Sequence, residues 1–212
     1  ALLSSSQDAM RNLAGLEAQR VSAGLGEAYD TATTLAGTLR LQQQQGILTR
    51  QGVSALLKQQ LLAHPEWVGV STLWEPDAFD GADATHVDDE GHDSSGRFMS
   101  YWARVGGELV SEPLRDYEDP KLGAWYVTPR TLKKPVIIEP YPYEVGGKTL
   151  MLTTIAIPIM DGDKVLGVVT SDFELSTLQE RIAQLRPMGQ GRTELLSPMG
   201  MVVASPDAAE GR

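Results

Sequence analysis

Residues 148–172 read KTLMLTTIAIPIMDGDKVLGVVTSD and contain two apolar runs joined by Asp161-Gly162. The first run ends at Ile159, the second extends from Val165 to Glu174, and both are rich in β-branched residues, which favour strands. An Asp-Gly pair between two such runs is typical of a β-hairpin turn. The sequence therefore predicts an antiparallel hairpin with one acidic residue, Asp172, near its end.

Asp172 is open to two interpretations. A single carboxylate in an apolar strand can be the polar group of a ligand pocket, since small-molecule sites combine apolar walls with a few convergent polar groups. The alternative is a strand-end residue whose carboxylate accepts hydrogen bonds from nearby backbone N–H groups. The local sequence is compatible with both.

Aromatic residues concentrate just before this hairpin. Residues 117–126 read YEDPKLGAWY, and Tyr141 and Tyr143 follow, so that four of the six tyrosines lie between residues 117 and 172. Asp119 and Pro120 are expected to be the N-cap and first residue of a helical segment that ends near Pro129. The aromatic side chains form either hydrophobic core or the wall of a pocket.

The remaining chain alternates between helical and strand patterns. Apolar residues recur at helical spacing from Leu2 to about Gln45, which predicts one long helix over residues 1–45. Antiparallel hairpins grouped between helices indicate an α+β fold. The other expected elements are a helix at 48–62, a strand at 67–74, a hairpin at 98–112, a helix with a Ser176/Gln179 capping box that runs to Arg186, and a small hairpin at 193–204.

Composition excludes several classes of function. The 212 residues carry 18 Lys and Arg against 28 Asp and Glu, a net charge of −10 that repels phosphate backbones, so no nucleic-acid partner is expected. The absence of cysteine excludes disulfides, Cys-ligated metals and thiol nucleophiles. The chain opens inside a helical pattern without Met, so we expect an excised domain whose membrane-spanning segments lie outside it.

Residues 86–93 bring two histidines and four carboxylates together. The residue types suit a divalent metal, but their spacing matches no known type of metal site, and we expect a solvated acidic loop without metal. No nucleophile elbow, phosphate loop or metalloprotease motif occurs anywhere in the chain. We therefore expect no catalytic residues, no cofactor and no enzymatic activity.

Five stretches in order resemble the landmarks of one family: residues 93–98 (DSSGRF), 101–102 (YW), 125–126 (WY), 139–141 (EPY) and 167–172 (GVVTSD). They are similar to double Cache (dCache_1) domains, the extracytoplasmic sensor modules of bacterial methyl-accepting chemotaxis receptors. The resemblance implies a long N-terminal helix along two PAS-like antiparallel-sheet modules. Residues 1–45 would be that helix, 46–186 the membrane-distal, ligand-binding module with a connecting helix, and 187–212 the start of the membrane-proximal module.

The resemblance also implies a location and partners. A domain of this type lies in the periplasm as part of an inner-membrane protein, with flanking transmembrane segments and a cytoplasmic signalling domain. A homodimer through the long helix is a further expectation. The alternative is a module with the same fold that binds no ligand and serves a structural or protein-binding role.

In the amino-acid-binding branch of this family, a Tyr-x4-Arg-x-Trp-Tyr pattern precedes a later Asp, the Arg takes the ligand's carboxylate, and the second Tyr and the Asp take its ammonium. Trp125, Tyr126 and Asp172 match that pattern, whereas Gly123 stands where the Arg is expected. The resemblance therefore implies an ammonium site without a carboxylate clamp. We expect standard α-amino acids not to bind, since an unpaired carboxylate in a pocket costs several kcal/mol.

Two ligand classes remain. An amine or quaternary amine would pair with Asp172 inside an aromatic wall. A purine of the uric acid, xanthine or guanine type would stack on the same rings, with its N–H groups at Asp172 and its carbonyl oxygens at Arg97, Arg115 or Arg130. The candidate ligand-binding residues are Asp172, Tyr126, Trp125, Tyr141, Tyr117, Tyr143, Arg115, Arg130 and Trp102.

Overall fold

The computed structural model describes residues 2–185, 192–197 and 199–205. The chain divides into two compact units, Asp30–Phe173 and a second unit formed by Ala1–Tyr29 with Glu174–Arg212. The helix α1 (Leu2–Gln44) contributes residues to both units. The predicted module boundaries near residues 45 and 186 stay predictions. The second of them lies at the edge of the described residues.

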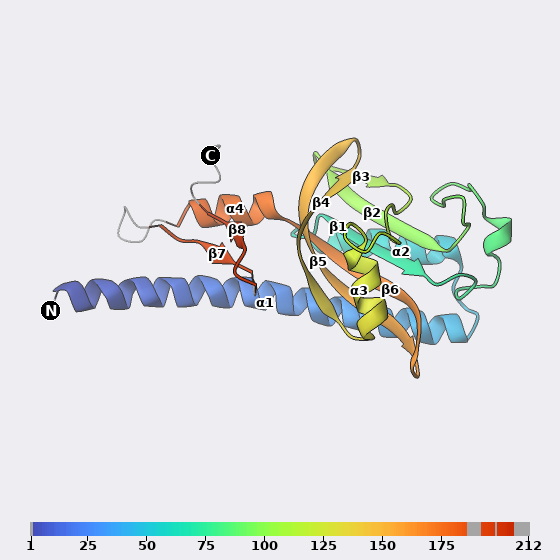
Figure 1. Cartoon of the computed structure of the whole chain (residues 1–212), viewed down its shortest axis with the longest axis horizontal. Helices are drawn as coiled ribbons and strands as arrows, with labels where there is room; N and C mark the ends of the chain where they lie inside the picture. The colour runs from blue at the N-terminus through green and yellow to red at the C-terminus, as the bar shows by residue number, and fades with distance from the viewer. Residues whose placement is uncertain (1, 186–191, 198, 206–212) are drawn as a thin grey trace. The chain divides into compact units, whose positions relative to one another are not determined.

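The unit Asp30–Phe173 contains a six-stranded sheet (Figure 1). Its order is β3-β2-β1-β6-β5-β4, and the registered pairs that flank β1 run antiparallel. The predicted α+β fold with a long N-terminal helix is confirmed. The strands are β1 (Gly69–Trp74), β2 (Met99–Val105), β3 (Glu108–Ser111), β4 (Val136–Val145), β5 (Lys148–Asp161) and β6 (Lys164–Glu174).

Glycines with positive φ make the turns between consecutive strands. Gly106 and Gly107 join β2 to β3 with φ of 62° and 89°, and Gly162 joins β5 to β6 with φ of 56°. Residues with a Cβ rarely adopt this backbone region, which is why glycine occupies these turns. The hairpin predicted at Asp161-Gly162 is confirmed.

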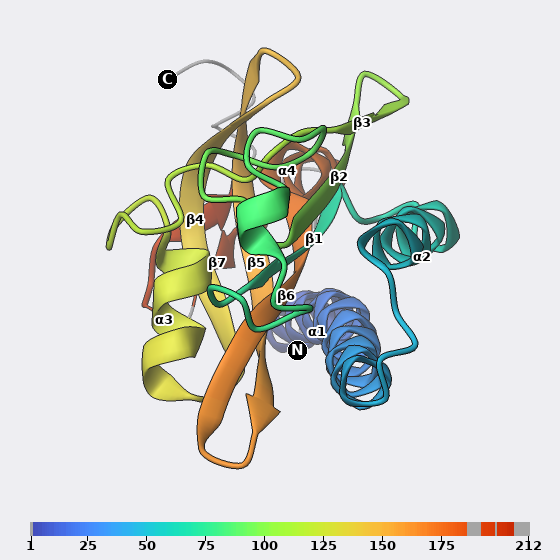
Figure 2. The same cartoon turned by 90° about the vertical axis from the view of Figure 1, so that its right-hand side faces the viewer.

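Helices lie on both faces of the sheet, as the end-on view in Figure 2 shows. The helix α2 (Arg50–Ala63) packs on β1 and β2, and its buried Val53, Leu57 and Leu61 face the sheet. On the opposite face, α3 (Ala124–Leu132) packs on β4 and β5. A short 3-10 helix, η1 (Asp83–Thr85), lies in the long connection between β1 and β2.

The start of α3 differs from its prediction. The helix begins at Ala124, because the carboxylate of Asp119 accepts hydrogen bonds from the backbone N–H groups of Lys121 and Leu122 at 2.8 Å and holds a separate turn. The helix also continues through Pro129 to Leu132 instead of ending there.

The second unit contains one end of α1, the helix α4 (Leu175–Ala183) and the strands β7 (Leu195–Leu196) and β8 (Val202–Ala204). The predicted capping box of α4 is wrong. The side chain of Gln179 instead donates to the carbonyl of Ser205 and accepts from its N–H at 2.8 Å, so it joins α4 to the end of β8. No helix among the described residues combines the length and hydropathy of a membrane span.

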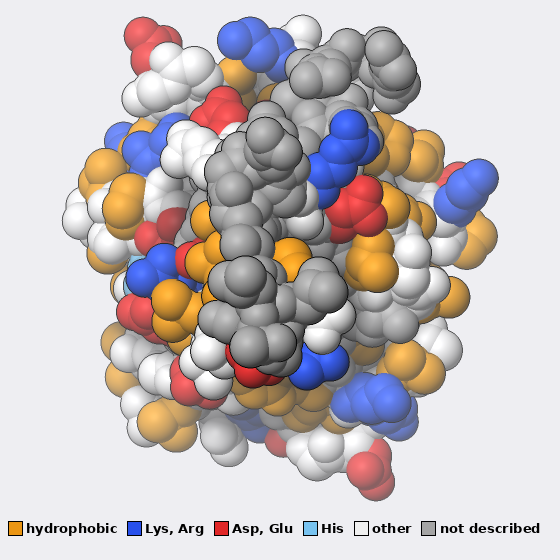
Figure 3. All heavy atoms as spheres, turned by 90° about the vertical axis from the view of Figure 1, so that its left-hand side faces the viewer, with side chains coloured by type: hydrophobic (Ala, Val, Ile, Leu, Met, Phe, Trp, Pro, Cys, Tyr) orange, Lys and Arg blue, Asp and Glu red, His pale blue; other side chains and the backbone are white. Residues whose placement is uncertain are grey.

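Charged side chains of both signs are interspersed with hydrophobic ones on the face shown in Figure 3. The side chains visible there therefore do not gather into a basic stripe of the kind that binds a phosphate backbone. This agrees with the net charge of −10.

Arg50 connects α2 to the long connection between β1 and β2. Its guanidinium donates to both carboxylate oxygens of Asp80 at 2.7 and 2.8 Å, to Asp83 at 2.7 Å and to the carbonyl of Gly96 at 2.8 Å. Arg50 is 8% and Asp83 6% exposed. The hydrogen bond from Arg50 lowers the pKa of Asp80. One buried cation thus holds together segments about thirty to forty-five residues apart in sequence.

We predict that Arg50→Met destabilises the domain by about 3–5 kcal/mol, since it leaves the carboxylate of Asp83 buried without its cation. Urea unfolding at pH 7 measures the change. Arg11→Met is the matched control, because Arg11 pairs at 3.8 Å with Asp8, the two side chains are 79% and 69% exposed, and an exposed pair contributes under about 1 kcal/mol. Equal losses in the two variants would contradict the role given to Arg50.

Candidate functional site

Asp172 lies on the face of the sheet that carries α3. In the strand register Gly69 stands opposite both Asp172 on β6 and Ala103 on β2. A Cβ atom at Gly69 would come within 2.6 Å of Asp172 Oδ2 and 2.9 Å of the Tyr101 ring. The missing side chain of Gly69 therefore makes the space into which the carboxylate and the phenol both point. Asp172 is only 4% exposed there.

A chain of hydroxyl groups ends at this carboxylate. Thr154 Oγ1 donates to Asp172 Oδ1 at 2.8 Å, and the Tyr141 hydroxyl lies 2.8 Å from Thr154 Oγ1. Because the single hydroxyl proton of Thr154 goes to the carboxylate, Thr154 accepts the proton of Tyr141. Ser71 Oγ and Thr170 Oγ1, on the same face, lie 2.6 Å apart. These hydrogen bonds orient the carboxylate toward the aromatic side chains.

Aromatic rings surround Asp172. The rings of Tyr101 and Tyr143 meet edge to face with centroids 5.8 Å apart, and those of Tyr141 and Tyr143 do so at 6.3 Å. Trp125 completes the set from α3, and its buried indole N–H has no hydrogen-bond partner. The cavity thus combines one carboxylate, four aromatic rings and one free N–H donor, which is a typical composition for a small-ligand site.

Burial dominates the electrostatics of this cavity. It raises the pKa of Asp172 to about 6, against the opposing effect of the hydrogen bonds from Thr154 and Thr170. Burial, with the nearby Asp172 charge, also raises the pKa values of Tyr101 and Tyr141 well above the ordinary value. The phenols therefore stay protonated, and Asp172 is the group that titrates near neutral pH.

The cavity is nearly closed. Its volume is about 10 Å³, roughly the space that one water molecule needs. Leu114, in the connection between β3 and α3, lines it and is 4% exposed. The backbone N–H of Arg115 donates to the Tyr143 hydroxyl at 3.1 Å and holds this connection in place. A cavity of this volume does not hold an organic molecule unless residues that line it move.

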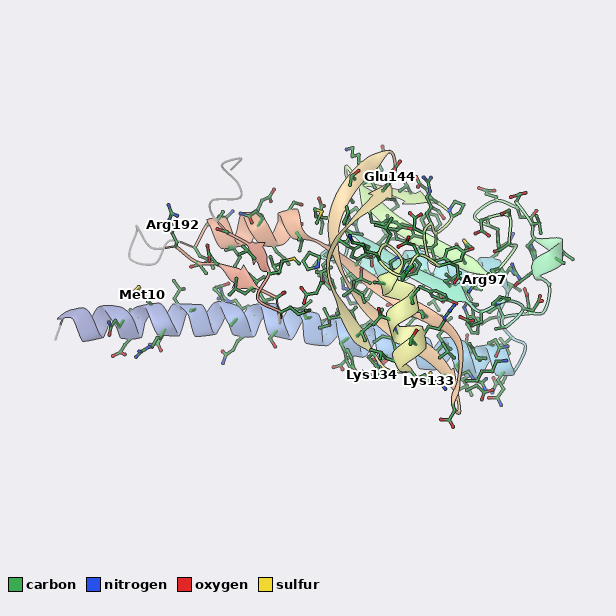
Figure 4. All side chains as sticks on the ribbon, in the orientation of Figure 1. Met10, Arg97, Lys133, Lys134, Glu144 and Arg192 are labelled. Atoms are coloured by element: carbon green, nitrogen blue, oxygen red, sulfur yellow. The ribbon has the colours of Figure 1, made fainter. Side chains whose placement is uncertain are left out.

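A second cluster gathers three of the predicted residues away from the cavity. Arg97 lies beside α3 (Figure 4), and its guanidinium donates to the Tyr126 hydroxyl and, at 2.8 Å, to Glu118. The Tyr126 hydroxyl donates in turn to Glu75, whose carboxylate lies 3.7 Å from Arg130. The Tyr117 hydroxyl donates to Asp93 at 2.5 Å. These polar groups satisfy one another and link α3 to the β1–β2 connection and to the β3–α3 connection.

The structure therefore brings together only some of the predicted residues. Trp125, Tyr141, Tyr143 and Asp172 line one cavity, and the predictions that they bind a ligand stay predictions. Trp102 points to the other face of the sheet, where its indole N–H donates to Ser54 at 2.9 Å. The exposed Arg115 side chain lies 3.7 Å from Glu112. Tyr117, Tyr126 and Arg130 belong to the cluster around Arg97.

Four cavity residues were missed from the sequence: Ser71, Tyr101, Leu114 and Thr170. The sequence does offer a signal for Tyr101. It precedes Trp102 in a predicted strand, and because neighbouring strand residues face opposite sides, only one of the two can face Asp172. Choosing between the two required the register of β1 with β2 and β6. Ser71 and Thr170 are polar residues inside apolar strands, and this pattern indicates buried hydrogen-bonding groups.

The histidines and carboxylates of residues 86–93 do not converge. Within the described part of the chain, no three His, Asp or Glu side chains are placed to share a metal ion. His86 Nδ1 lies 2.8 Å from Asp89, and the ring of His86 stacks on that of His92 with centroids 5.4 Å apart.

Comparison with known proteins gives a family for this fold. A sequence model described as methyl-accepting chemotaxis protein-like, first PDC sensor domain, matches residues 53–180. The chain is 35% identical over 167 residues to the methyl-accepting chemotaxis protein TlpQ of Pseudomonas aeruginosa. That match covers 72% of this chain and only 23% of TlpQ, so the chain spans about a quarter of that relative's length.

Solved structures agree with this match. The extracellular domain of the putative histidine kinase mmHK1S-Z2 is 28% identical with a TM-score of 0.83, over 95% of this chain and 73% of that one. Methyl-accepting chemotaxis protein X is 27% identical with a TM-score of 0.80, over 97% and 74% of the two chains. Together with the family match over residues 53–180, they show that this chain belongs to the PDC sensor domains of the methyl-accepting chemotaxis protein-like family.

Proposed function

We propose that this domain is the periplasmic sensor of a transmembrane chemoreceptor of the double Cache type, and that it binds an amine or quaternary amine at Asp172. The observation that carries the proposal is a buried carboxylate enclosed by Tyr101, Tyr141, Tyr143 and Trp125. A cation is the ligand that gains from both features, through an ion pair with the carboxylate and through contact with the ring faces.

The charges around the cavity argue against an anionic ligand. Among the described residues, no Lys or Arg side chain lines it. Arg130 on α3 and Arg97 beside it each lie within 4 Å of Glu75 and Glu118, and Lys133 and Lys134 lie at the C-terminal end of α3 (Figure 4). The carboxylate of an α-amino acid would therefore stay unpaired beside Asp172, at a cost of several kcal/mol. Each ring that meets the cation instead contributes about 0.5–2 kcal/mol.

A purine is the second candidate, favoured by one observation. The free indole N–H of Trp125 needs an acceptor, which a purine ring nitrogen or carbonyl provides and a simple alkylamine does not. Asp172 in its neutral form could also donate to such a ring. An amine that carries a hydroxyl or ether oxygen would satisfy Trp125 as well, so the amine class as a whole stays first.

Signalling belongs to the same proposal. Transmembrane segments on either side, a cytoplasmic signalling domain and a homodimer through α1 would carry the response across the membrane. Movement of the connection between β3 and α3 during ligand entry is the change that such a receptor would transmit. If none of the probes below binds, the alternative is that this domain binds no ligand and has a structural or protein-binding role.

We predict that choline and ethanolamine bind the domain and that Asp172→Asn weakens both roughly 10- to 100-fold, since each loses its ion pair with the carboxylate and the ammonium of ethanolamine also loses a charge-assisted hydrogen bond, which contributes about 1.5–3 kcal/mol. Titration calorimetry at pH 7.5 measures both, with Asp163→Asn in the exposed β5–β6 turn as the matched control. Xanthine and L-alanine are the competing probes. Tightest binding by L-alanine, or equal affinity in wild type and Asp172→Asn, would overturn the amine assignment.

The pH dependence separates the two ligand classes. Choline keeps its charge at every pH, so its affinity depends on the ionisation of Asp172, whose pKa is about 6. We expect choline affinity to fall about tenfold for each pH unit below 6, because one proton must be released on binding. The affinity for xanthine should show no such fall if xanthine accepts a hydrogen bond from the neutral carboxyl group of Asp172. Calorimetry at pH 5, 6 and 7.5 makes the comparison.

The ligand-free domain should lose stability as the pH rises from about 4 to about 6. The pKa of Asp172 is raised from 3.8 to about 6, so in this window the folded state holds a proton that the unfolded state has released. The loss is at most about 3 kcal/mol. Asp172→Asn should therefore be more stable than wild type at pH 7.5 and nearly equal to it at pH 3, below both pKa values of Asp172, in urea unfolding. A less stable variant at pH 7.5 would show that the ionised carboxylate stabilises the fold.

A further inference from the structure

The opposite face of the sheet carries a larger groove. Its volume is about 530 Å³, within the range of about 300–1,000 Å³ that small-molecule sites occupy. The alternation of β2 turns Ser100 and Trp102 toward α2, while Tyr101 faces Asp172 on the other side. Phe98 precedes β2 on the same side as Ser100 and lines one end of the groove. Arg50 and Ser54 of α2 form one wall, and residues 86–92 form the other.

Two buried polar atoms in this groove have no hydrogen-bond partner. Ser100 is 6% exposed and its Oγ is unpaired, and His92 Nε2 is likewise buried and unpaired. His92 Nδ1 lies 3.1 Å from the carbonyl of Glu90. A carbonyl only accepts, so Nδ1 donates this hydrogen bond and Nε2 is the ring nitrogen without a partner among the described residues. Unpaired buried groups are rare in folded proteins.

The charged groups that line the groove are either paired or exposed to solvent. The guanidinium of Arg50 is engaged by Asp80 and Asp83, and His86 Nδ1 faces Asp89 at 2.8 Å. Glu90 is exposed to solvent. Among the described residues that line the groove, the buried groups without partners are a hydroxyl and an imidazole nitrogen, and neither carries a fixed charge. An ionic ligand would therefore find no free counter-charge in the buried part of the groove, whereas a neutral one satisfies both atoms.

We propose that this groove is a second ligand site, distinct from the Asp172 cavity, for a neutral hydroxyl-rich solute such as a sugar or polyol. A hydroxyl group both donates and accepts, so one hydroxyl donates to His92 Nε2 and another exchanges a hydrogen bond with Ser100 Oγ. The apolar face of a sugar ring packs on the edge of Trp102, since Phe98 is only 1% exposed. Lys58 Nζ lies 4.5 Å from the centroid of the Trp102 ring and covers one face of it, and the indole N–H of Trp102 donates to Ser54.

The two sites have separate tryptophan reporters. The indole N–H of Trp102 lies at the groove and that of Trp125 at the Asp172 cavity. We expect D-glucose, trehalose or myo-inositol, titrated to ~50 mM, a range that covers millimolar affinity, to shift the Trp102 signal saturably in nitrogen-edited NMR spectra. The Trp125 signal should stay in place during that titration and respond to choline.

Ser100→Ala tests the assignment without threatening the fold, because removing an unpaired buried hydroxyl is neutral or stabilising. The variant should bind the sugar probe about fivefold or more weakly, the effect of one buried hydrogen bond, and Asp163→Asn should bind it as wild type does. His92→Phe, which keeps a ring but removes Nε2, should weaken it as well. No Trp102 shift with any of the three probes, a shift at Trp125 alone, or equal affinity in Ser100→Ala and wild type would each overturn the proposal.

Discussion

The register of β1 against its two neighbours is the constraint on which the site depends. Because Gly69 stands opposite both Asp172 and Ala103, the position beside the carboxylate holds no side chain, and the Tyr101 ring fits over it. A slip of one residue would turn Asp172 to the α2 side of the sheet. The burial of Asp172 and its raised pKa depend on this alignment, and Thr154 donates to the carboxylate from β5 on the other side of β6.

The two faces of the sheet use polar groups in different ways. On the α3 side a carboxylate is buried among neutral hydroxyls and rings without a cation, which is costly and leaves it able to attract one. On the α2 side Arg50 is matched by Asp80 and Asp83, so that charge contributes to the fold. The contrast supports the two proposals, a cationic ligand on the first face and a neutral one on the second.

Gly123 has a structural role that its position in the family pattern does not reveal. A Cβ atom there would lie 2.3 Å from the carbonyl oxygen of Asp116 and 2.8 Å from that of Asp119. The glycine therefore lets the chain before α3 fold tightly against itself. The absence of an arginine at this position reflects the path of the backbone as well as the ligand, and an arginine could stand here only if residues 116–119 followed a different course.

The sequence by itself determined the kinds of element and much of their order. Helical spacing identified α1, and the Asp161-Gly162 pair identified the β5–β6 hairpin. Trp74 at the end of β1, and Trp67 and Phe98 next to β1 and β2, are buried as large aromatic residues in apolar stretches usually are. These signals are local, because periodicity and turn chemistry act over a few residues. Asp172 and Trp125 were predicted as candidate ligand-binding residues from their match to a family pattern, and both line the cavity.

Only the tertiary structure decided which side chains share the cavity. Tyr101 and Trp102 are neighbours in one strand, yet they lie on opposite faces of the sheet. Trp125 and Tyr126 are neighbours on one helix, yet one lines the cavity while the other bonds to Arg97 and Glu75. Adjacent residues point about 180° apart on a strand and about 100° apart on a helix. Which of them meets Asp172 depends on packing between segments distant in the chain, and no local pattern encodes that.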